Sequence, residues 1–427
     1  MSAYLSRAWA GDLAAVTGKP FAYTAIALIA LGPGFVNMLL VVSLLLDRQP
    51  QLSLDHEYPA ITILMAAYNE QDIILETLRG IAGQDYPAPI KIVAVDDGSE
   101  DRTVELLEHN RLPNMRVISA SHGGKAAALN TGMAEAATEI LVTMDADTFL
   151  HPQALRRIVA RFLQDPPNTA AVAGSVMAKN SRSTRMARLQ EYDYFLAIAS
   201  VKRQQGLYQG TLVAQGAFSL YRKSLVSKAR GWPNVVGEDI VLTWALIKEG
   251  ARIGYEPTAI GFTNVPENFR HFVNQRRRWA RGMIEGFKNH FNLIYRRRSL
   301  ASLLVAMNLL YPPFDAAYTL LFIPGIALAL TGRFWLVGPM TLTVLPLNLT
   351  VVAIMFHFQK HVFELLNLKV RRNRGGFLLY ILIYQAILSP VALMGYLEEL
   401  LGRKKMWRKP SPAEHLKEPG HEGDKAA

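Results

Sequence analysis

The stretch ITILMAAYNEQDIILETLRGIAG (61–83), followed by KIVAV (91–95), decides the fold of this chain. The apolar runs at 61–67 and 91–95 are typical of strands buried on both faces, and the amphipathic residues between them are typical of a helix. The alternation continues with apolar runs at MRVIS (115–119), EILVTM (139–144) and AAVAG (170–174), and with helical stretches at RTVELLEHN, KAAALNTGMAEAA and PQALRRIVARFL. This pattern predicts an α/β domain, with a mostly parallel sheet and helices on both faces.

Three of these strands end in polar clusters, namely Tyr68-Asn69-Glu70, Asp96-Asp97-Gly98-Ser99 and Asp145-Ala146-Asp147. Ligands of such sheets bind at the carboxyl ends of the strands, so the clusters would gather at one edge. Gathered carboxylates repel one another unless a cation is present, and a divalent metal completed by substrate phosphates would supply it. We expect Asp147 to bind the metal and Asp145 to contact the ribose or to support the metal from outside. Each cluster alone is also compatible with an ordinary turn.

Two further polar segments precede predicted helices. In HGGK (122–125) the glycines can admit a phosphate and Lys125 adds a positive charge, although the spacing is not that of a Walker motif. A flexible turn with a solvated lysine is the simpler interpretation. Glu238-Asp239 opens the helical stretch EDIVLTWALIKEG (238–250). The helix dipole stabilises carboxylates in a first turn, which explains the pair structurally and would also keep Asp239 ionised as a general base.

The segment QRRRW (275–279) lies in a basic and aromatic stretch that precedes a long apolar part of the chain. On a helix, Gln275, Arg278 and Trp279 share one face because they are three or four residues apart. A guanidinium suits a diphosphate, and an indole suits stacking on the apolar face of a sugar. We expect Arg276 and Arg277 to point elsewhere, toward lipid phosphates.

The composition indicates a soluble domain joined to membrane segments. The chain has 427 residues, of which 50% are hydrophobic, and a formal charge of +11. Basic residues concentrate where cytoplasmic segments meet anionic lipid, and the basic runs here adjoin apolar segments, so nucleic acid is not an expected partner. The sequence contains no cysteine, which excludes disulfides, zinc–thiolate sites and cysteine nucleophiles.

The chain divides into five predicted regions: an N-terminal transmembrane helix region (1–50), the α/β domain (51–265), an amphipathic interfacial helix with QRRRW (266–298), a C-terminal transmembrane region (299–405) and a disordered tail (406–427). Within the C-terminal region, residues 299–332 are expected to form an interfacial helix and one span. Residues 334–358 and 375–397 are each expected to form a further span.

As a set, these motifs resemble those of the processive family 2 glycosyltransferases, which include bacterial synthases of cellulose, hyaluronan, chitin oligosaccharides and poly-β-1,6-N-acetylglucosamine. The resemblance covers about residues 58 to 285, in the order YNE, DDGS, GGKAAALN, DAD, AQGAFSLYR, ED and QxxRW. It implies a glycosyltransferase domain of the GT-A type joined to α-helical membrane segments, a UDP-sugar donor, and Mg²⁺ or Mn²⁺ as cofactor.

The resemblance also implies how the donor is bound. Tyr68, Glu70 and Asp97 would hold the uridine, with Asp96 as a neighbour. Lys125 and Arg278 would lie against the diphosphate. Asp145 and Asp147 would bind the nucleotide and its metal ion.

On the acceptor side, the resemblance makes Asp239 the catalytic base, with Glu238 beside it. Gln275 and Trp279 would hold the acceptor sugar at the mouth of a polymer channel, together with Gln215 and Gly216. Gln215 is not a residue that the family commonly shows at its position, so this chain departs from the family in its acceptor site.

These roles imply an inverting, metal-dependent hexosyltransferase that polymerises a UDP-sugar. The layout is most similar to that of synthases using UDP-N-acetylglucosamine to make poly-β-1,6-N-acetylglucosamine, a biofilm exopolysaccharide that crosses the plasma membrane. Hyaluronan, chitin or a β-glucan of the cellulose type are alternative products. A non-processive enzyme that glycosylates a polyprenyl phosphate or another lipid is a second alternative, although such enzymes usually lack QxxRW. An inactive membrane scaffold is a third, which the intact carboxylates disfavour.

The expected partners are the UDP-sugar, the growing polysaccharide and the lipid bilayer. Similar synthases often need a small membrane subunit, and some sense cyclic di-GMP in trans, so both are included among the expected partners. The expected location is the bacterial inner (plasma) membrane, crossed several times, with the catalytic domain in the cytoplasm.

Overall fold

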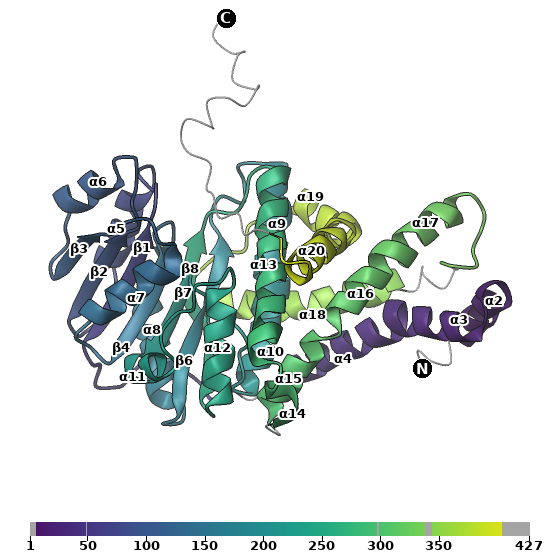
Figure 1. Ribbon diagram of the computed structural model, residues 1–427, viewed down its shortest axis with the longest axis horizontal. Coiled ribbons are helices and arrows are strands. Elements are labelled where there is room, and N and C mark those ends of the chain that lie inside the picture. Colours follow the sequence, from purple (N-terminus) through teal and green to yellow (C-terminus); the bar gives the residue numbers. More distant parts are fainter. Residues whose placement is uncertain (1–5, 48, 297–298, 338–343, 404–427) are drawn as a thin grey trace, which may run out of the picture.

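The computed structural model describes residues 6–47, 49–296, 299–337 and 344–403, and the tail expected at 406–427 lies outside them. At the centre of the described chain is an eight-stranded sheet in the order β3-β2-β1-β4-β7-β6-β8-β5 (Figure 1). Its strands are β1 (Ile61–Ala67), β2 (Ile90–Asp96), β3 (Met115–Ser119), β4 (Ile140–Asp145), β5 (Phe149–Leu150), β6 (Thr169–Ala178), β7 (Phe218–Arg222) and β8 (Arg252–Thr263).

The five strands predicted from apolar runs are present as β1, β2, β3, β4 and β6. β1 pairs in parallel with β2 and β4, β2 with β3, and β6 with β8. β7 runs antiparallel to β4 and β6, and the short β5 runs antiparallel to β8. The predicted α/β fold is confirmed, and the reversed β7 makes the sheet a mixed one of the GT-A type.

Helices cover both faces of the sheet because successive side chains of a strand point in opposite directions. On one face, Leu64 of β1 shares a buried cluster with Leu129 and Trp244; on the other, Ile63 shares one with Ile158. The helices of this domain are α5 (Ile74–Ala82), α6 (Thr103–His109), α7 (Lys125–Glu135), α8 (Ala154–Gln164), α9 (Arg185–Tyr192), the π-helical turn η2 (Asp193–Ile198), α10 (Ala199–Leu207), α11 (Lys223–Lys228) and α12 (Glu238–Lys248).

The parallel register places the polar strand ends side by side. Ala67 at the end of β1 pairs with Asp96 of β2, and the preceding Ala66 pairs with Asp145 of β4. Gly98 then turns the chain with a φ of 78°, and a Cβ on this residue would lie 3.0 Å from the backbone nitrogen of His122. Glycine is required there by both conformation and space, so the DDGS turn lies directly against the HGGK loop.

A long helix, α13 (Phe269–His290), leaves the α/β domain and packs along membrane-type helices (Figure 1). Three helical stretches are long and apolar enough to cross a membrane: Lys19–Leu45, Leu300–Leu330 and Arg374–Leu400. The chain outside the α/β domain forms α2 (Arg7–Thr17), α3 (Lys19–Ile26), η1 (Ala27–Leu31), α4 (Gly32–Leu45), α14 (Leu293–Arg296), α15 (Leu300–Asn308), α16 (Tyr311–Ala317), η3 (Tyr318–Phe322), α17 (Ile323–Leu330), α18 (Val344–Leu365), α19 (Arg374–Leu379), η5 (Tyr380–Tyr384) and α20 (Gln385–Leu400).

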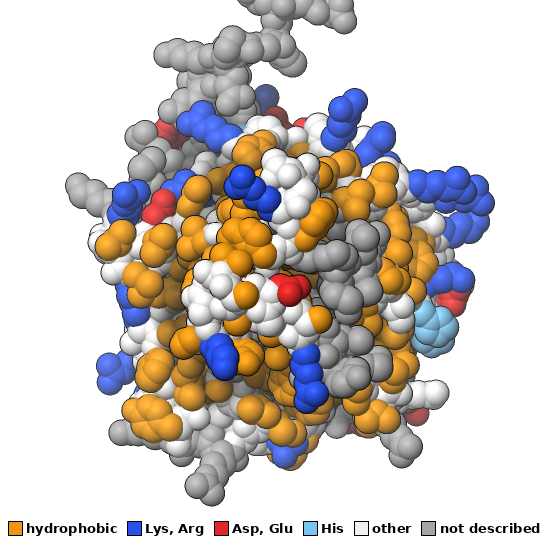
Figure 2. All heavy atoms as spheres, turned by 90° about the vertical axis from the view of Figure 1, so that its right-hand side faces the viewer, with side chains coloured by type: hydrophobic (Ala, Val, Ile, Leu, Met, Phe, Trp, Pro, Cys, Tyr) orange, Lys and Arg blue, Asp and Glu red, His pale blue; other side chains and the backbone are white. Residues whose placement is uncertain are grey.

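The surface of these helices fits a membrane protein. Large apolar side chains such as Phe35, Met38 and Leu320 are more than half exposed. Figure 2 shows apolar side chains spread across this face of the molecule, with Lys and Arg side chains set apart from one another around it. Exposed apolar area of this extent marks a surface that meets lipid or protein.

The expected span at 334–358 is not among the candidate spans in the described part of the chain. Residues 338–343 lie outside the described chain, residues 334–337 are not helical, and α18 covers 344–358 and extends to Leu365. Met355 of α18 shares a buried cluster with Leu44 of α4 and Phe195 of η2, so this helix packs between the first span and the α/β domain.

Candidate active site

The turn after β1 holds two residues predicted to bind the uridine. The ring of Tyr68 lies against the ring of His122, with their centroids 4.6 Å apart. The backbone N–H of Glu70 donates to Thr103 Oγ1 at 2.8 Å, which fixes the turn to the start of α6. The YNE turn therefore meets the HGGK loop on one side and α6 on the other.

The two aspartates of the DDGS turn make different contacts. Asp97 is buried, and its carboxylate accepts hydrogen bonds from the N–H groups of Gly123 at 2.8 Å and Gly124 at 3.0 Å. Asp96 is also buried, and its Oδ2 accepts from the Gly98 N–H at 3.1 Å. Its Oδ1 has no hydrogen-bond partner within the described chain. Because an unsatisfied buried acceptor is costly, Asp96 offers an oxygen that a bound ligand could satisfy, whereas Asp97 ties two loops together.

Lys125, the first residue of α7, joins three of the predicted motifs. Its Nζ forms an ion pair with Asp145 and lies 3.9 Å from Glu238 Oε1. Burial opposes the charged ammonium, but the attraction of Asp145 and Glu238 outweighs it and raises the pKa of Lys125. Gly216 makes room for this lysine, since a Cβ on Gly216 would lie 2.5 Å from Nζ.

The acidic pair at the start of α12 faces two neighbours of different kinds. Asp239 Oδ2 accepts a long hydrogen bond from the Gly216 N–H at 3.4 Å. Glu238 is buried, and burial together with the negative charge of Asp239 raises the pKa of Glu238 to about 7, although Lys125 and Arg278 pull it down. Asp239 therefore faces the predicted acceptor segment, and Glu238 faces the cations.

The start of α12 is held against α13 by close backbone contact. A Cβ on Gly237 would lie 2.5 Å from Gly282 Cα, so the two helices can approach only through glycines. The N–H of Gly237 donates to Glu285 Oε2 at 2.8 Å. This contact sets the distance between the acidic pair and the helix that carries QRRRW.

The residues predicted to bind a metal fit a shared site. Asp145 is the last residue of β4 and Asp147 lies two positions further on, where its Oδ1 accepts a hydrogen bond from Thr263 Oγ1 at 3.2 Å. Carboxylate oxygens are the ligands that Mg²⁺ and Mn²⁺ prefer, and substrate phosphates commonly complete their coordination. The described residues hold no group of three or more His, Cys, Asp or Glu side chains able to enclose a metal. The donor set thus fits a metal bound jointly by protein and phosphate.

The QRRRW segment brings an open indole and a cation to the site. Trp279 is 39% exposed and meets Tyr194 edge to face, with ring centroids 6.2 Å apart. Burial and Asp239 raise the pKa of Glu238, and the positive charge of Arg278 opposes that rise, so its guanidinium is within electrostatic reach of the acidic pair. Gln275 Oε1 is buried without a hydrogen-bond partner among the described residues.

The two central arginines do not point toward lipid, and that prediction was wrong. Arg276 is buried, and its Nη2 lies 2.9 Å from Asp193 Oδ2. Arg277 donates from Nε to Glu398 of α20 at 3.2 Å. Helical periodicity places these side chains on different faces, but α13 is covered by the α/β domain on one side and by α20 on the other. Little of the helix is therefore left to face lipid.

Two buried charges near the site were missed from the sequence. Lys202 of α10 donates from Nζ to the Val213 carbonyl at 2.6 Å, and burial lowers the pKa of Lys202 to about 8, although Asp239 pulls it up. Asp193 is the partner of Arg276. The only sequence signal was a charged residue on either side of the apolar run YFLAIASV (194–201), which is also the pattern of a surface helix. The predicted acceptor residue Gln215 donates its amide to the Gly174 carbonyl at 2.8 Å.

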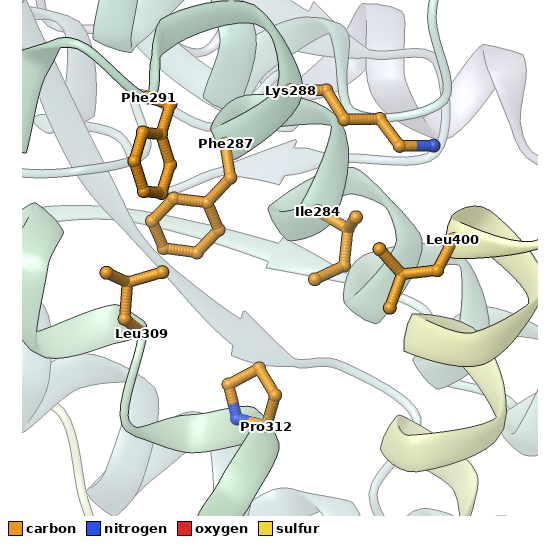
Figure 3. A pocket seen from close by; sticks show the side chains of 7 residues that line it. All are labelled: Ile284, Phe287, Lys288, Phe291, Leu309, Pro312 and Leu400. Carbon is orange, nitrogen blue, oxygen red and sulfur yellow. The ribbon is translucent and has the colours of Figure 1, made fainter.

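A separate apolar pocket of about 360 Å³ lies between α13 and the membrane-type helices (Figure 3). Phe287 and Phe291 face Leu309 and Pro312 across it, and Lys288 extends along its rim. None of the residues predicted to bind donor, metal or acceptor lines this pocket. The candidate active site is the polar edge of the sheet.

The mixed sheet, with carboxylates at its strand ends and a lysine between them, has the GT-A fold. Residues 62–230 match the family model of Glycosyl transferase family 2.

Curated relatives extend the likeness. The chain is 34% identical over 240 residues to a poly-beta-1,6-N-acetyl-D-glucosamine synthase of Staphylococcus aureus (strain MSSA476), which covers 56% of this chain and 57% of the relative. It is 32% identical over 225 residues to the synthase of that name from Staphylococcus epidermidis, covering 52% of this chain and 54% of the relative. The aligned part thus spans just over half the length of these relatives.

Among solved structures, a mannosyltransferase from Pyrobaculum calidifontis in complex with GDP-Man and Mn²⁺ is similar in fold. The TM-score is 0.62 at 19% sequence identity, and the match covers 90% of this chain and 99% of that chain. At this identity the likeness shows the fold and nothing finer.

Proposed function

We propose that this protein is a membrane-embedded, processive glycosyltransferase that polymerises a UDP-sugar and exports the chain across the plasma membrane. One observation carries the proposal: the buried Glu238 and the partly buried Lys125 and Asp239 form a cluster against the QRRRW helix, which in turn packs on a span-length apolar helix. The similarity to poly-β-1,6-N-acetylglucosamine synthases favours UDP-N-acetylglucosamine as donor and that exopolysaccharide, a biofilm component, as product.

The donor nucleotide would bind along the carboxyl ends of β1, β2 and β4. Tyr68 would pack against the uracil ring and Glu70 would close this end of the site. The partnerless oxygen of Asp96 would accept a hydrogen bond from the base, while Asp97 holds the loop beneath it. This modifies the expectation that Asp97 itself contacts the uridine.

The diphosphate would lie between two cations and a metal. Lys125 and Arg278 supply positive charge from opposite helices, and Asp145 and Asp147 would hold Mg²⁺ or Mn²⁺. When bound, the metal would neutralise charge on the departing diphosphate. The ion pair between Lys125 and Asp145 would open as phosphate oxygens replace one of its partners.

Asp239 is the proposed base of the transfer step. It takes the proton from the acceptor hydroxyl while that oxygen attacks C1 of the donor sugar from the side opposite the diphosphate. The bond between C1 and the phosphate oxygen breaks with its electron pair, and UDP leaves. The configuration at C1 inverts, so an α-linked donor gives a β-linked product. Glu238 holds Lys125 in place beside the leaving diphosphate.

The acceptor would approach along the face opposite the nucleotide. The Gly216 N–H and Asp239 mark the point where its hydroxyl reacts. The exposed ring of Trp279 would stack on the terminal sugar, and the Gln275 amide would meet a sugar hydroxyl. Gln215 shapes this segment through its hydrogen bond to β6.

The layout proposed for the whole protein follows the five regions predicted from the sequence. Residues 51–265 would lie in the cytoplasm, and the spans of 1–50 and 299–405 would surround the polymer channel in a bacterial inner membrane. A small membrane subunit and control by cyclic di-GMP in trans are part of this proposal.

The test supplies the purified protein in lipid with radiolabelled UDP-N-acetylglucosamine, UDP-glucose or UDP-glucuronate plus UDP-N-acetylglucosamine. The expected product forms from UDP-N-acetylglucosamine alone and is cut by a hydrolase specific for the β-1,6 linkage. Digestion by chitinase, cellulase or hyaluronidase instead would show that the product is a different polymer. Label confined to one sugar on a lipid would contradict the polymerase proposal.

A further inference from the structure

Arg276 lies in an aromatic cage at the centre of the QRRRW segment. Its side chain is buried, and the guanidinium carbon lies 4.0 Å from the ring centroid of Trp279, 5.1 Å from that of Phe272 and 5.7 Å from that of Tyr194. A guanidinium over an aromatic face is attracted by the ring electrons, and most strongly over an indole. One face of the partly exposed Trp279 ring is therefore covered by Arg276.

The counterion of Arg276 comes from an irregular helix of the α/β domain. Asp193 begins η2, a π-helical turn, and its carboxylate is buried 2.9 Å from Arg276 Nη2. The next residue, Tyr194, forms the wall of the cage that meets Trp279 edge to face. π-Helical turns inside longer helices frequently occur at functional sites. This turn places Asp193 against Arg276 of α13, and it places Tyr194 against both Arg276 and Trp279.

The cage also connects the site to the membrane. Phe272, the floor beneath Arg276, is fully buried and meets Tyr384 of η5, within the span Arg374–Leu400, at a centroid distance of 6.0 Å. Burial is the main cause that raises the pKa of Tyr194 to about 12, and the charge of Asp147, one of the two proposed metal ligands, adds to the rise. The cage thus lies between the metal site and the membrane helix.

A buried ion pair of this kind contributes little to net stability, because desolvating both charges offsets their attraction. Two well-packed apolar residues would fill the same space. What the pair does provide is position, since the carboxylate of Asp193 holds the charged guanidinium of Arg276 close to the Trp279 ring.

We propose that Arg276 and Asp193 form a positioning pair that fixes the indole plane of Trp279 for stacking on the acceptor sugar. Neither residue touches donor or acceptor. The inference rests on the proposed function, because it assigns a role to Trp279 in acceptor binding.

The experiment compares Asp193→Asn, Arg276→Lys and the volume-matched double variant Arg276→Met with Asp193→Asn. Each is assayed in lipid with UDP-N-acetylglucosamine and a series of β-1,6-linked N-acetylglucosamine oligomers. We expect the KM for the oligomer to rise about tenfold, whereas the KM for the donor and the rate of donor hydrolysis stay within about twofold. The double variant should keep the melting temperature, because methionine and asparagine leave no unpaired charge buried at the site.

The matched control is Arg277→Lys, on the same helix but paired with Glu398 outside the cage. It should leave the oligomer KM unchanged. The combination of Arg276→Lys with Trp279→Ala should have the same oligomer KM as Trp279→Ala alone, because both changes act through the Trp279 ring. An unchanged oligomer KM in a folded double variant, or equal loss of transfer and donor hydrolysis, would overturn the inference. If the unaltered protein makes no polymer, the proposed function fails. That outcome is distinct from the changes in oligomer KM that test the positioning pair.

Discussion

Glu238 and Asp239 are adjacent in the chain but have different surroundings. Glu238 is enclosed beside Lys125, whereas Asp239 faces the Gly216 N–H on the acceptor side. The roles proposed for them follow from this difference: Glu238 pairs with the cation, and Asp239 takes the proton from the reacting hydroxyl.

Replacing the proposed base should separate binding from chemistry. Asp239→Asn keeps the size of the side chain but removes the proton acceptor, so transfer should fall by about 10²–10⁴-fold. Binding of UDP, measured by calorimetry, should persist, because the proposed uridine contacts are made by other residues, among them Tyr68 and Asp96. Loss of UDP binding with the same variant would remove Asp239 from the role of base.

Glu238 should make stability depend on pH. Its folded pKa is raised from 4.5 to about 7, so the neutral form is favoured in the folded state. The stability that this group contributes is present below pH 4.5 and is lost as the pH rises through about 7. Glu238→Gln cannot lose a proton, so the melting temperature of the variant relative to the unaltered protein should rise between pH 5 and pH 8. A difference that is constant over this range would refute the assignment.

The sequence identified most of the charged residues that meet at the site, because each motif directly follows a predicted strand or opens a predicted helix. It did not identify which carboxylate of the DDGS turn carries a free oxygen, since that depends on the backbone of the HGGK loop. It also misplaced Arg276, whose partner Asp193 is distant in the sequence and lies in a π-helical turn.

At the scale of elements, the approach of α12 to α13 sets the geometry of the site. Gly237 and Gly282 meet backbone to backbone, and this contact positions the acidic pair against QRRRW. The first strands and helices were predictable from apolar periodicity. β8 was not, because its interior holds Glu256 and Pro257, which read as a loop. Glu256 is accommodated by a buried ion pair with Arg161 that no local pattern reveals.

Gly282→Ala tests this contact. The added Cβ would lie 2.9 Å from Gly237 Cα, so the helices must separate. We expect a loss of about 1–3 kcal/mol of stability, seen as a lower melting temperature, together with reduced transfer. Gly34→Ala in α4 is the control, since nothing lies within 4 Å of its Cβ position, and it should be neutral or slightly stabilising. Wild-type activity and stability in Gly282→Ala would show that the contact does not set the site.

At the scale of the whole molecule, ion pairs and packing join the α/β domain to the membrane-type helices. Arg277 and Arg281 of α13 pair with Glu398 and Glu399 of α20. This arrangement places the proposed acceptor face beside the span Arg374–Leu400. The candidate spans Lys19–Leu45 and Arg374–Leu400 were predictable from hydropathy, whereas the span expected at 334–358 is not among the candidates in the described chain. The contact of Arg374–Leu400 with α13 was not predictable, because it depends on charges near the end of that span.

The shared metal site predicts dependence on a divalent cation. Removal of metal by EDTA should abolish transfer, and Mg²⁺ or Mn²⁺ should restore it. Because phosphates complete the proposed site, metal binding measured by calorimetry should be weak alone and tighten when UDP is added. Asp147→Asn should weaken this coupled binding by about tenfold or more. Full activity in EDTA would contradict the metal-dependent mechanism.

In the proposed function, one enzyme molecule adds many sugars to one chain beside the membrane. The decisive experiment is a pulse of radiolabelled UDP-N-acetylglucosamine, followed by excess unlabelled donor and a large excess of fresh oligomer acceptor. A processive enzyme predicts that labelled chains continue to lengthen during the chase while the fresh acceptor stays short. Label confined to single-sugar products, or spread evenly over short oligomers, would contradict the account.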